Sequence, residues 1–245
     1  MAVRVRPLEC GWLTSDFAGM VSGQSGKQRM PVAAFLVEHP RGRLVFDTGM
    51  HPDLILGTAR LGSIAAMFAF EYGEEARLDA RLAQVDIDAA SVPFAAVSHL
   101  HFDHCGGLAT VPNARLLVQR AEWDAAQKPK LVEARIFNPG DFDVGHDRAL
   151  LDGEHDVFGD RSVRLVPTPG HTAGHQSLLI EDRLLLVGDA CYCRLALDGD
   201  ALPAFGHDLV QQRRTFAWLR ECEAAGIRLI FSHDPDQWRT LGELL

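Results

Sequence analysis

The sequence predicts an α/β protein whose β-sheets are covered by helices. Short apolar runs rich in Val, Leu, Ile and Phe alternate with stretches of helical periodicity. Five of these apolar runs end in Asp or His, which indicates a site built from strand ends. The 245 residues contain no internal repeat or obvious linker. We therefore expect one domain, residues 1–245, that is large enough to bury a substantial core.

The expected strands are apolar runs bounded by residues that favour turns. In chain order these runs are 32–39, 43–49, 94–99, 115–119, 162–168, 177–182, 183–189 and 228–233. The expected helices are 74–85, 120–127 and 207–226. The last helix is the longest, and its apolar residues Leu209, Phe216, Leu219 and Cys222 follow helical spacing before a stop at Gly226.

Composition and charge narrow the class of partner. The net charge of −9, from 24 basic and 33 acidic residues, disfavours nucleic acid or an anionic membrane as the main partner. Five cysteines are an odd and sparse set, which suits a reducing compartment. The N-terminal residues lack an apolar h-region, and no run reaches the roughly 20 apolar residues that span a bilayer. We expect a soluble, cytoplasmic protein.

The stretch "VSHLHFDHCGG", residues 97–107, concentrates ionisable side chains at the end of an apolar run. His99 and His101 are two residues apart, so in an extended segment both point to the same side and can reach one ion. Asp103 and His104 lie just beyond and could reach a second ion. A zinc ion takes about four N, O or S ligands, and a catalytic ion leaves one position for water. Two ions therefore need more ligands than this stretch supplies.

Three further residues that follow apolar runs can complete the set, namely His171, Asp189 and His233. An aspartate can bridge two ions through its two oxygens, which a histidine cannot do, so Asp189 is the expected bridge. We expect two divalent metal ions, most simply Zn²⁺, with Fe, Mn or Co as alternatives. A purely structural role for the clustered histidines is the competing interpretation. His175 is expected to support the site without binding a metal, and His39, His51, His146, His155 and His207 are expected to be structural or solvated.

These motifs resemble those of the metallo-β-lactamase superfamily. "SHLHFDHCGG" is similar to its H-x-H-x-D-H motif, and "TPGHTAGHQSL", "VGDA" and "FSHD" are similar to its later ligand motifs, in the same order. The resemblance implies a four-layer αβ/βα sandwich, in which two mixed β-sheets are flanked by helices and a dinuclear site lies at one edge. Ser232 stands where the family usually has glycine, which changes a neighbour of a ligand and not a ligand.

The resemblance also implies how the ligands are shared. One ion would be held by three histidines, and the other by an aspartate and two histidines, with Asp189 between them. The first set is His99, His101 and His171. The second set is Asp103, His104 and His233.

Within the superfamily, "FDTGM", "LVQRAEW" and "GDACY" resemble the N-acyl homoserine lactonases. The resemblance implies that Tyr192 lies over the metals and contacts the lactone. The expected reaction opens the lactone ring of an N-acyl homoserine lactone by attack of a metal-bridging hydroxide. Tyr192 would donate to the carbonyl oxygen, and Asp103 would carry a proton to the leaving ring oxygen. The alternative for Tyr192 is a half-buried aromatic residue with a hydrogen-bonded hydroxyl.

An acyl chain needs an apolar groove, and the stretch 60–73 could line it. Met67, Phe68 and Phe70 are the candidate contacts, although a core helix is the favoured structure for most of this stretch. Asp47 either orients a ligand histidine or forms a turn at a strand end. The cysteines near the site are expected to pack as small buried residues without a redox role.

Two other functions remain open at this point. A thioesterase of the glyoxalase II type or a phosphodiesterase would require clustered basic residues to meet carboxylates or phosphates. The sequence offers only "QQRR" at 211–214 and scattered arginines. A non-hydrolytic metal-binding or redox module is the alternative from another class, and the complete ligand set with Tyr192 speaks against it.

Overall fold

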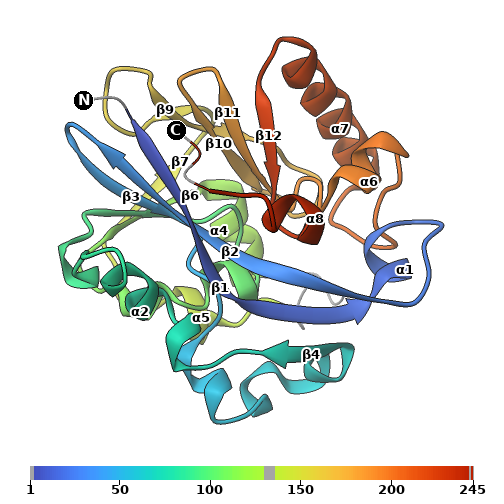
Figure 1. Ribbon diagram of the computed structural model, residues 1–245, viewed down its shortest axis with the longest axis horizontal. Coiled ribbons are helices and arrows are strands. Elements are labelled where there is room, and N and C mark those ends of the chain that lie inside the picture. The colour runs from blue at the N-terminus through green and yellow to red at the C-terminus, as the bar shows by residue number, and fades with distance from the viewer. Residues whose placement is uncertain (1–2, 130–135, 243, 245) are drawn as a thin grey trace.

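The computed structural model describes residues 3–129, 136–242 and 244, and it contains two mixed β-sheets that pack face to face between layers of helices (Figure 1). The predicted αβ/βα sandwich is therefore confirmed. Among the described residues, no helix has the length and apolar character needed to cross a bilayer.

The first sheet has seven strands in the order β4-β1-β2-β3-β5-β6-β7. The strands β1 and β2 form a long antiparallel hairpin. The parallel pairs are β3 with β5, β5 with β6, and β6 with β7. Their bounds are β1 Arg4–Asp16, β2 Lys27–His39, β3 Gly42–Phe46, β4 Phe68–Glu71, β5 Phe94–Ala96, β6 Arg115–Gln119 and β7 Arg148–Leu151.

The second sheet has five strands in the order β12-β11-β10-β9-β8. Its strands pair antiparallel except for β11 and β12, which run parallel. Their bounds are β8 His155–Asp156, β9 Val163–Pro167, β10 Gln176–Ile180, β11 Leu184–Gly188 and β12 Arg228–Phe231.

Helices cover the outer faces of both sheets, and α7 is the longest of those described, lying beside β12 in Figure 1. The α-helices are α1 Phe17–Met20, α2 Leu78–Ala83, α3 Phe102–Cys105, α4 Arg120–Gln127, α5 Pro139–Phe142, α6 Arg194–Asp198, α7 Leu209–Ala224 and α8 Pro235–Trp238. The 3-10 helices are η1 Pro52–Ile55, η2 Ala59–Met67, η3 Glu74–Ala76, η4 Ala89–Ser91 and η5 Leu108–Thr110.

The alternation of side chains along each strand produces the four layers. On β10, Leu178 and Ile180 face the core between the sheets, whereas Leu179 packs in the cluster formed with α6 and α7. On β2, Phe35 faces the core between the sheets and Leu36 faces the opposite side. Burying each of these side chains contributes about 1.5–3 kcal/mol, so apolar residues on both faces of a strand hold a sheet between two layers.

All eight predicted strands form, but several end earlier than predicted. Residues 47–49, 97–99 and 189 were expected to continue their strands and instead leave the sheet as irregular loops. The strand β1 was not predicted, because a register shift between Glu9 and Trp12 interrupts its period-two alternation. The predicted helix 74–85 is divided into η3 and α2, since Arg77 between them has an extended backbone (φ −61°, ψ 144°).

The expectation of a core helix for most of residues 60–73 holds only up to Met67, in the 3-10 helix η2, whose Leu61 and Ile64 are buried in the core. The backbone of Gly62 (φ 56°, ψ −133°) interrupts η2, and the following residues form β4, which pairs with β1 at the edge of the first sheet. Hydrogen bonding to an open sheet edge prevails over the helical periodicity of the sequence. The stretch is therefore an edge element that is only partly buried.

Candidate metal centre

The segment after β5 carries four of the predicted ligands. The chain leaves the sheet after Ala96 and places His99 and His101 before α3, with His101 at the N-cap of that helix. Asp103 and His104 then lie within the single turn of α3. A tight return follows, in which a side chain on Gly107 would collide with the carbonyl oxygen of Thr48. The local sequence therefore brings all four side chains to one edge of the first sheet.

The second sheet supplies the other three predicted ligands from loops at the same edge. His171 lies in the loop between β9 and β10, Asp189 directly follows β11, and His233 comes two residues after β12. The parallel pairing of β11 and β12 brings Asp189 and His233 to the same end of the sheet. All seven predicted ligands are brought together, and all of them are buried.

The first ligand group is formed by His99, His101, His171 and one oxygen of Asp189. His171 Nε2 lies 3.2 Å from His99 Nε2 and 3.1 Å from His101 Nδ1. Asp189 Oδ2 lies 3.5 Å from His171 Nε2 and 3.8 Å from His99 Nε2. These four atoms surround one point, where three imidazole nitrogens and one carboxylate oxygen could bind a single metal ion.

The second group is formed by Asp103, His104 and His233, and it faces the other oxygen of Asp189. Asp189 Oδ1 lies 3.3 Å from the Nε2 atoms of both His104 and His233. Asp103 Oδ2 lies 3.8 Å from His104 Nε2 and 3.6 Å from His233 Nε2. The two carboxylate oxygens of Asp189 thus face different ligand groups.

The spacing of these atoms fits a divalent cation in each group. Ligands in a tetrahedral zinc site, at 2.0–2.1 Å from the metal, lie about 3.3–3.4 Å from one another, and the distances here are 3.1–3.8 Å. His104 Nε2 is buried and makes no well-aligned hydrogen bond, although Asp189 Oδ1 lies 3.3 Å away. A buried polar atom left in this way is costly unless a ligand satisfies it.

Charge in the centre is divided unevenly between the groups. Burial lowers the pKa of His99 and of His101 well below the usual value, which favours the neutral imidazole that binds metals. Burial also acts against the charged form of His104, but nearby carboxylates, led by Asp189, raise its pKa well above the usual value. Protons and a cation compete for the same carboxylate-rich position, and a bound divalent ion would replace the proton.

Asp47 contacts one histidine of each group, directly or through one side chain. Its Oδ2 lies 2.9 Å from His104 Nδ1 and accepts a hydrogen bond from Ser98 Oγ at 3.0 Å. Ser98 Oγ in turn lies 2.9 Å from His99 Nδ1. Asp47 has a positive φ of 59°, which is uncommon for a residue with a side chain. Of the two interpretations of Asp47, the structure favours the one in which it orients a ligand histidine.

His175 and Glu122 brace the loops that carry the ligands. His175 Nε2 accepts a hydrogen bond from the backbone N–H of Asp189 at 3.0 Å, as expected for a supporting residue. Glu122, on α4, accepts from the backbone N–H groups of Leu100 (3.0 Å) and Gly174 (2.9 Å). Sequence reasoning did not identify Glu122. The available signal was its place four residues before Ala126, on the helix face that is buried.

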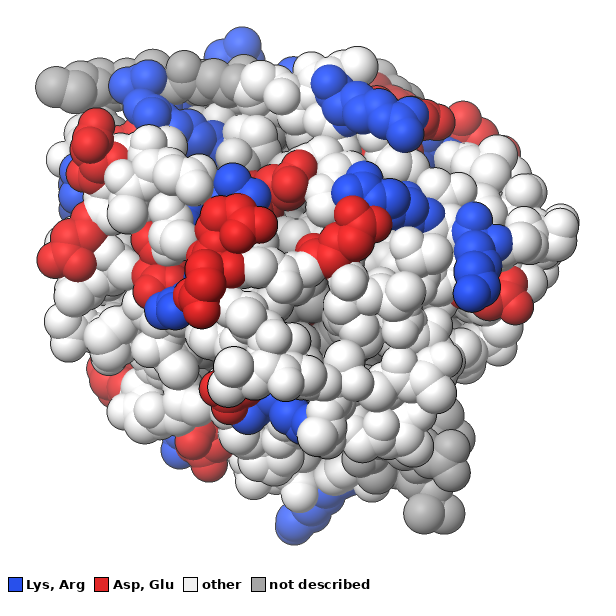
Figure 2. Space-filling view, turned by 60° about the horizontal axis from the view of Figure 1, so that its bottom comes forward, with Lys and Arg blue, Asp and Glu red and all other residues white. Residues whose placement is uncertain are grey.

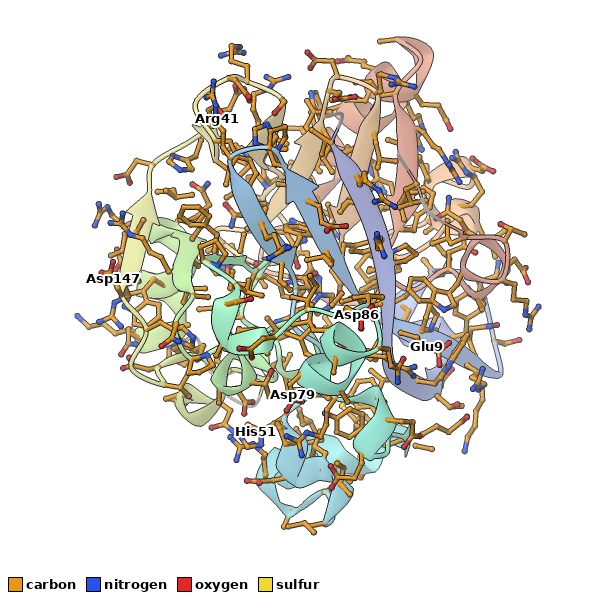
Figure 3. All side chains as sticks on the ribbon, turned by 60° about the vertical axis from the view of Figure 1, so that its left-hand side comes forward. Glu9, Arg41, His51, Asp79, Asp86 and Asp147 are labelled. Carbon is orange, nitrogen blue, oxygen red and sulfur yellow. The ribbon has the colours of Figure 1, made fainter. Side chains whose placement is uncertain are left out.

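None of the other five histidines, all of which the structure describes, belongs to either ligand group, although the backbone N–H of His207 donates to the carbonyl oxygen of His171 at 3.0 Å. His51, labelled in Figure 3 near Asp79, caps η1 by accepting from the backbone N–H of Asp53 at 3.1 Å. His39 pairs with Asp160 at 3.0 Å.

Tyr192 lies beside the centre. Its hydroxyl is 3.4 Å from His171 Nδ1, and its ring centroid is 5.5 Å from that of His171 and 5.7 Å from that of His233. Burial raises the pKa of Tyr192 well above its usual value, so the hydroxyl remains a proton donor at neutral pH. The side chain also lines a cavity that it shares with five of the ligand residues, Asp103 among them.

The cavity has a volume of about 530 Å³, and the ligand groups form its floor. Met67 and Phe68 line it as predicted, but Phe70 does not, because its ring packs against those of Phe68 (6.1 Å) and Phe102 (6.2 Å). Much of the lining was not predicted and comes from the β1–β2 hairpin, namely Leu13, Thr14, Ser15, Asp16, Gly19, Met20, Lys27 and Met30.

Comparison with known proteins identifies the family. A family model described as the metallo-beta-lactamase superfamily matches residues 28–233. The N-acyl homoserine lactonase AttM of Azorhizobium caulinodans is 32% identical over 230 residues, which cover 89% of this chain and 88% of that protein. An N-acyl homoserine lactonase of a Bacillus species is 31% identical over 221 residues, covering 86% of this chain and 84% of that protein.

Solved structures agree with this assignment. An N-acyl homoserine lactone hydrolase with the product N-hexanoyl-L-homoserine bound at its catalytic metal centre has a TM-score of 0.87 and 26% identity, covering 99% of this chain and 98% of that chain. A mutant of AiiA from B. thuringiensis with N-decanoyl-L-homoserine at its active site has a TM-score of 0.87 and 25% identity, with the same coverage. The chain therefore belongs to the metallo-β-lactamase superfamily, as its ligand motifs predicted.

Proposed function

We propose that this protein is a dinuclear metal-dependent hydrolase that opens the lactone ring of N-acyl homoserine lactones. One observation carries the proposal: the two oxygens of Asp189 face two separate ligand groups at the floor of a cavity that Tyr192 also lines. Relatives named as lactonases at 31–32% identity support the choice of substrate. We also propose that residues 1–245 form one hydrolase domain, because loops of both sheets contribute ligand residues to this site.

Each ligand group would hold one divalent ion, with Asp189 shared between them. Imidazole and carboxylate ligands suit Zn²⁺ best, with Fe, Mn or Co as alternatives. When bound, two such ions lower the pKa of a water molecule to near neutrality and polarise a carbonyl group.

The protein's own residues would orient the lactone and move protons. The Tyr192 hydroxyl would donate to the carbonyl oxygen of the lactone and to the charge that develops there, an interaction worth about 3 kcal/mol for one donor. Asp103 lines the same cavity and would carry a proton to the ring oxygen as it leaves. The product would be an N-acyl homoserine.

The apolar part of the cavity would take the acyl chain. Its side chains include Met20, Met30, Ile64, Met67 and Phe68. Each methylene group that leaves water contributes about 0.8 kcal/mol. We therefore expect the apparent affinity to rise with chain length until the chain extends beyond this wall.

The charge of the cavity and the position of Tyr192 disfavour two other activities. A thioesterase of the glyoxalase II type or a phosphodiesterase would favour a basic cavity, but Lys27 is the one Lys or Arg among the described residues that line it. On the face shown in Figure 2, acidic and basic side chains lie interspersed and do not form a basic patch. A non-hydrolytic metal-binding module would not require the Tyr192 hydroxyl beside the ions, so the position of Tyr192 favours a hydrolase.

The experiment that tests the proposal measures acid release from a panel of N-acyl homoserine lactones, using protein whose metal content has been counted. A glutathione thioester and a generic phosphodiester are assayed in parallel. We expect fast lactone opening at about two metals per chain, abolished by chelation and restored by added metal. Two bound metals with no lactone opening would contradict the proposed substrate, whereas turnover of the thioester or the phosphodiester would favour those alternatives.

We also propose a cytoplasmic location. All five cysteines are buried free thiols, which suits a reducing compartment. Burial raises the pKa of Cys10 to about 12, so this thiol is poorly reactive at neutral pH.

A further inference from the structure

Ser232 follows β12 and separates it from the ligand His233. Its side chain is buried, and Ser232 Oγ lies 2.6 Å from Asp189 Oδ1 and 3.1 Å from the carbonyl oxygen of Gly188. A serine hydroxyl has one proton to donate, and both neighbours are acceptors. The shorter contact is to a carboxylate, which accepts the stronger hydrogen bond. Ser232 therefore donates to Asp189.

This hydrogen bond falls on one of the two oxygens of Asp189. Oδ1 is the oxygen that lies 3.3 Å from both His104 and His233, in the second ligand group. Oδ2 faces His171 and His99 in the first group. The hydroxyl of Ser232 thus acts on the side of the carboxylate that serves the second group.

We propose that Ser232 is a positioning residue that fixes the orientation of the Asp189 carboxylate and thereby raises the affinity of the second ligand group for its ion. The inference rests on the proposed two-metal function. The backbone N–H of Asp189 is already held by His175 Nε2 at 3.0 Å, so the two side-chain torsions of Asp189 are the freedom that remains. Ser232 removes that freedom. Glycine at this position would not do so.

The effect should be selective for one ion. Loss of a residue that holds a metal ligand in place typically lowers metal affinity by about 10–100-fold. Here the loss should fall on the ion bound by Asp103, His104 and His233. The other ion also uses Asp189, through Oδ2, but it keeps three histidines whose mutual contacts do not involve Ser232, so its loss of affinity should be smaller.

The test compares Ser232→Ala in two backgrounds, each of which retains one ligand group. His171→Ala disables the first group, and His233→Ala disables the second. Each metal-free protein is titrated with Zn²⁺ against a chromophoric chelator. We expect Ser232→Ala to weaken binding by about 10–100-fold in the His171→Ala background, and to weaken it clearly less in the His233→Ala background.

Two further variants separate positioning from a general structural effect. Ser232→Thr retains the hydroxyl and should recover most of the affinity. Ser177→Ala removes another fully buried serine hydroxyl, which reaches the site only through Thr168 Oγ1 and His175, so it should not reproduce the difference between the two backgrounds. Thermal unfolding of each metal-free variant shows that it is folded.

Equal losses in both backgrounds, or no loss in either, would overturn the inference. If the unmodified protein binds two ions and Ser232→Ala matches it, only this inference fails. If the unmodified protein does not bind two ions, the proposed function itself fails.

Discussion

The floor and the outer wall of the cavity are built in contrasting ways. On the floor, the ligand side chains are buried, and the histidines have second partners, such as Asp47 for His104 and the carbonyl oxygen of Pro31 for His233. The outer wall consists of η2 and β4, where Met67 is 49% exposed and β4 contacts the sheet at its edge through β1 alone. The floor holds its atoms in fixed positions, whereas the wall offers apolar area.

This difference separates the chemistry from the choice of acyl chain. Buried hydrogen bonds fix the positions of ligand atoms, which a metal centre requires. The wall is joined to the rest of the chain by fewer contacts, among them the ion pair between Arg60 of η2 and buried Asp141 (2.6 Å). Substitutions on the wall should therefore change the affinity for chain length, and substitutions on the floor should change turnover and metal content.

The largest effect is expected at the floor, for Asp189→Ala. The variant loses the carboxylate that both ligand groups share, so both ions lose a ligand at once. We expect fewer than two metals per chain and a fall in lactone turnover of at least about 10³-fold, more than the loss of one oxyanion donor. Metal analysis and initial rates check this. Two tightly bound ions in the variant would contradict the role of Asp189 as the bridge.

A second prediction concerns the attachment of the wall. Arg60→Met leaves the Asp141 carboxylate buried without its partner, which typically costs about 3–5 kcal/mol. Urea unfolding measures this loss, and metal content should stay unchanged because the floor does not depend on Arg60. The control is the double variant Arg60→Met with Asp141→Leu, which should regain much of the stability. A drop in metal content would show that floor and wall are not independent.

A third prediction tests the polar contact above the floor. Tyr192→Phe should lower kcat by about 10²-fold, because one donor to the developing charge is lost, and it should leave two metals in place. Burial raises the pKa of Tyr192 well above its usual value, which favours the protonated hydroxyl that this role requires. Unchanged turnover in the variant would remove Tyr192 from the mechanism.

The smallest effect is expected on the wall itself. Phe68→Ala should raise KM for a ten-carbon acyl chain by about 10-fold and leave a four-carbon chain nearly unaffected, because only the long chain reaches this ring. Phe70→Ala is the matched control, since Phe70 belongs to the same strand and packs outside the cavity lining. Equal effects of both substitutions would mean that the aromatic cluster acts through packing and not through contact with the chain.

The floor could be predicted from the sequence because its signals are local. His99 and His101 share a side by strand geometry, and Asp189 and His233 each follow an apolar run whose end could be read directly. Glu122 could not be identified in this way, because its partners are backbone N–H groups from loops distant in the sequence. The motif "LVQRAEW" contains Glu122, but nothing in it indicates which groups the carboxylate contacts.

The wall could be predicted only in part. Periodicity alone does not distinguish a helix from an edge strand over short apolar runs. Here the backbone turn at Gly62 interrupts the helix, and the pairing of β4 with β1 makes the following residues a strand. The lining residues from the β1–β2 hairpin were hidden because the register shift in β1 masks its alternation. Which of two neighbouring phenylalanines faces the cavity depends on tertiary packing that no short window records.

The position of the metal centre between the two sheets has a consequence for the lifetime of the fold. Each ligand group takes side chains from the segment after β5 and from loops of the second sheet, so a bound ion ties together parts of the chain that are far apart in sequence. A bound ion therefore acts as a covalent cross-link does. It closes a long loop and so lowers the conformational entropy of the unfolded chain. In a cell that lacks the metal, the protein would lose stability as well as activity. The two parts of the chain would then separate more readily, and proteases would cleave it faster.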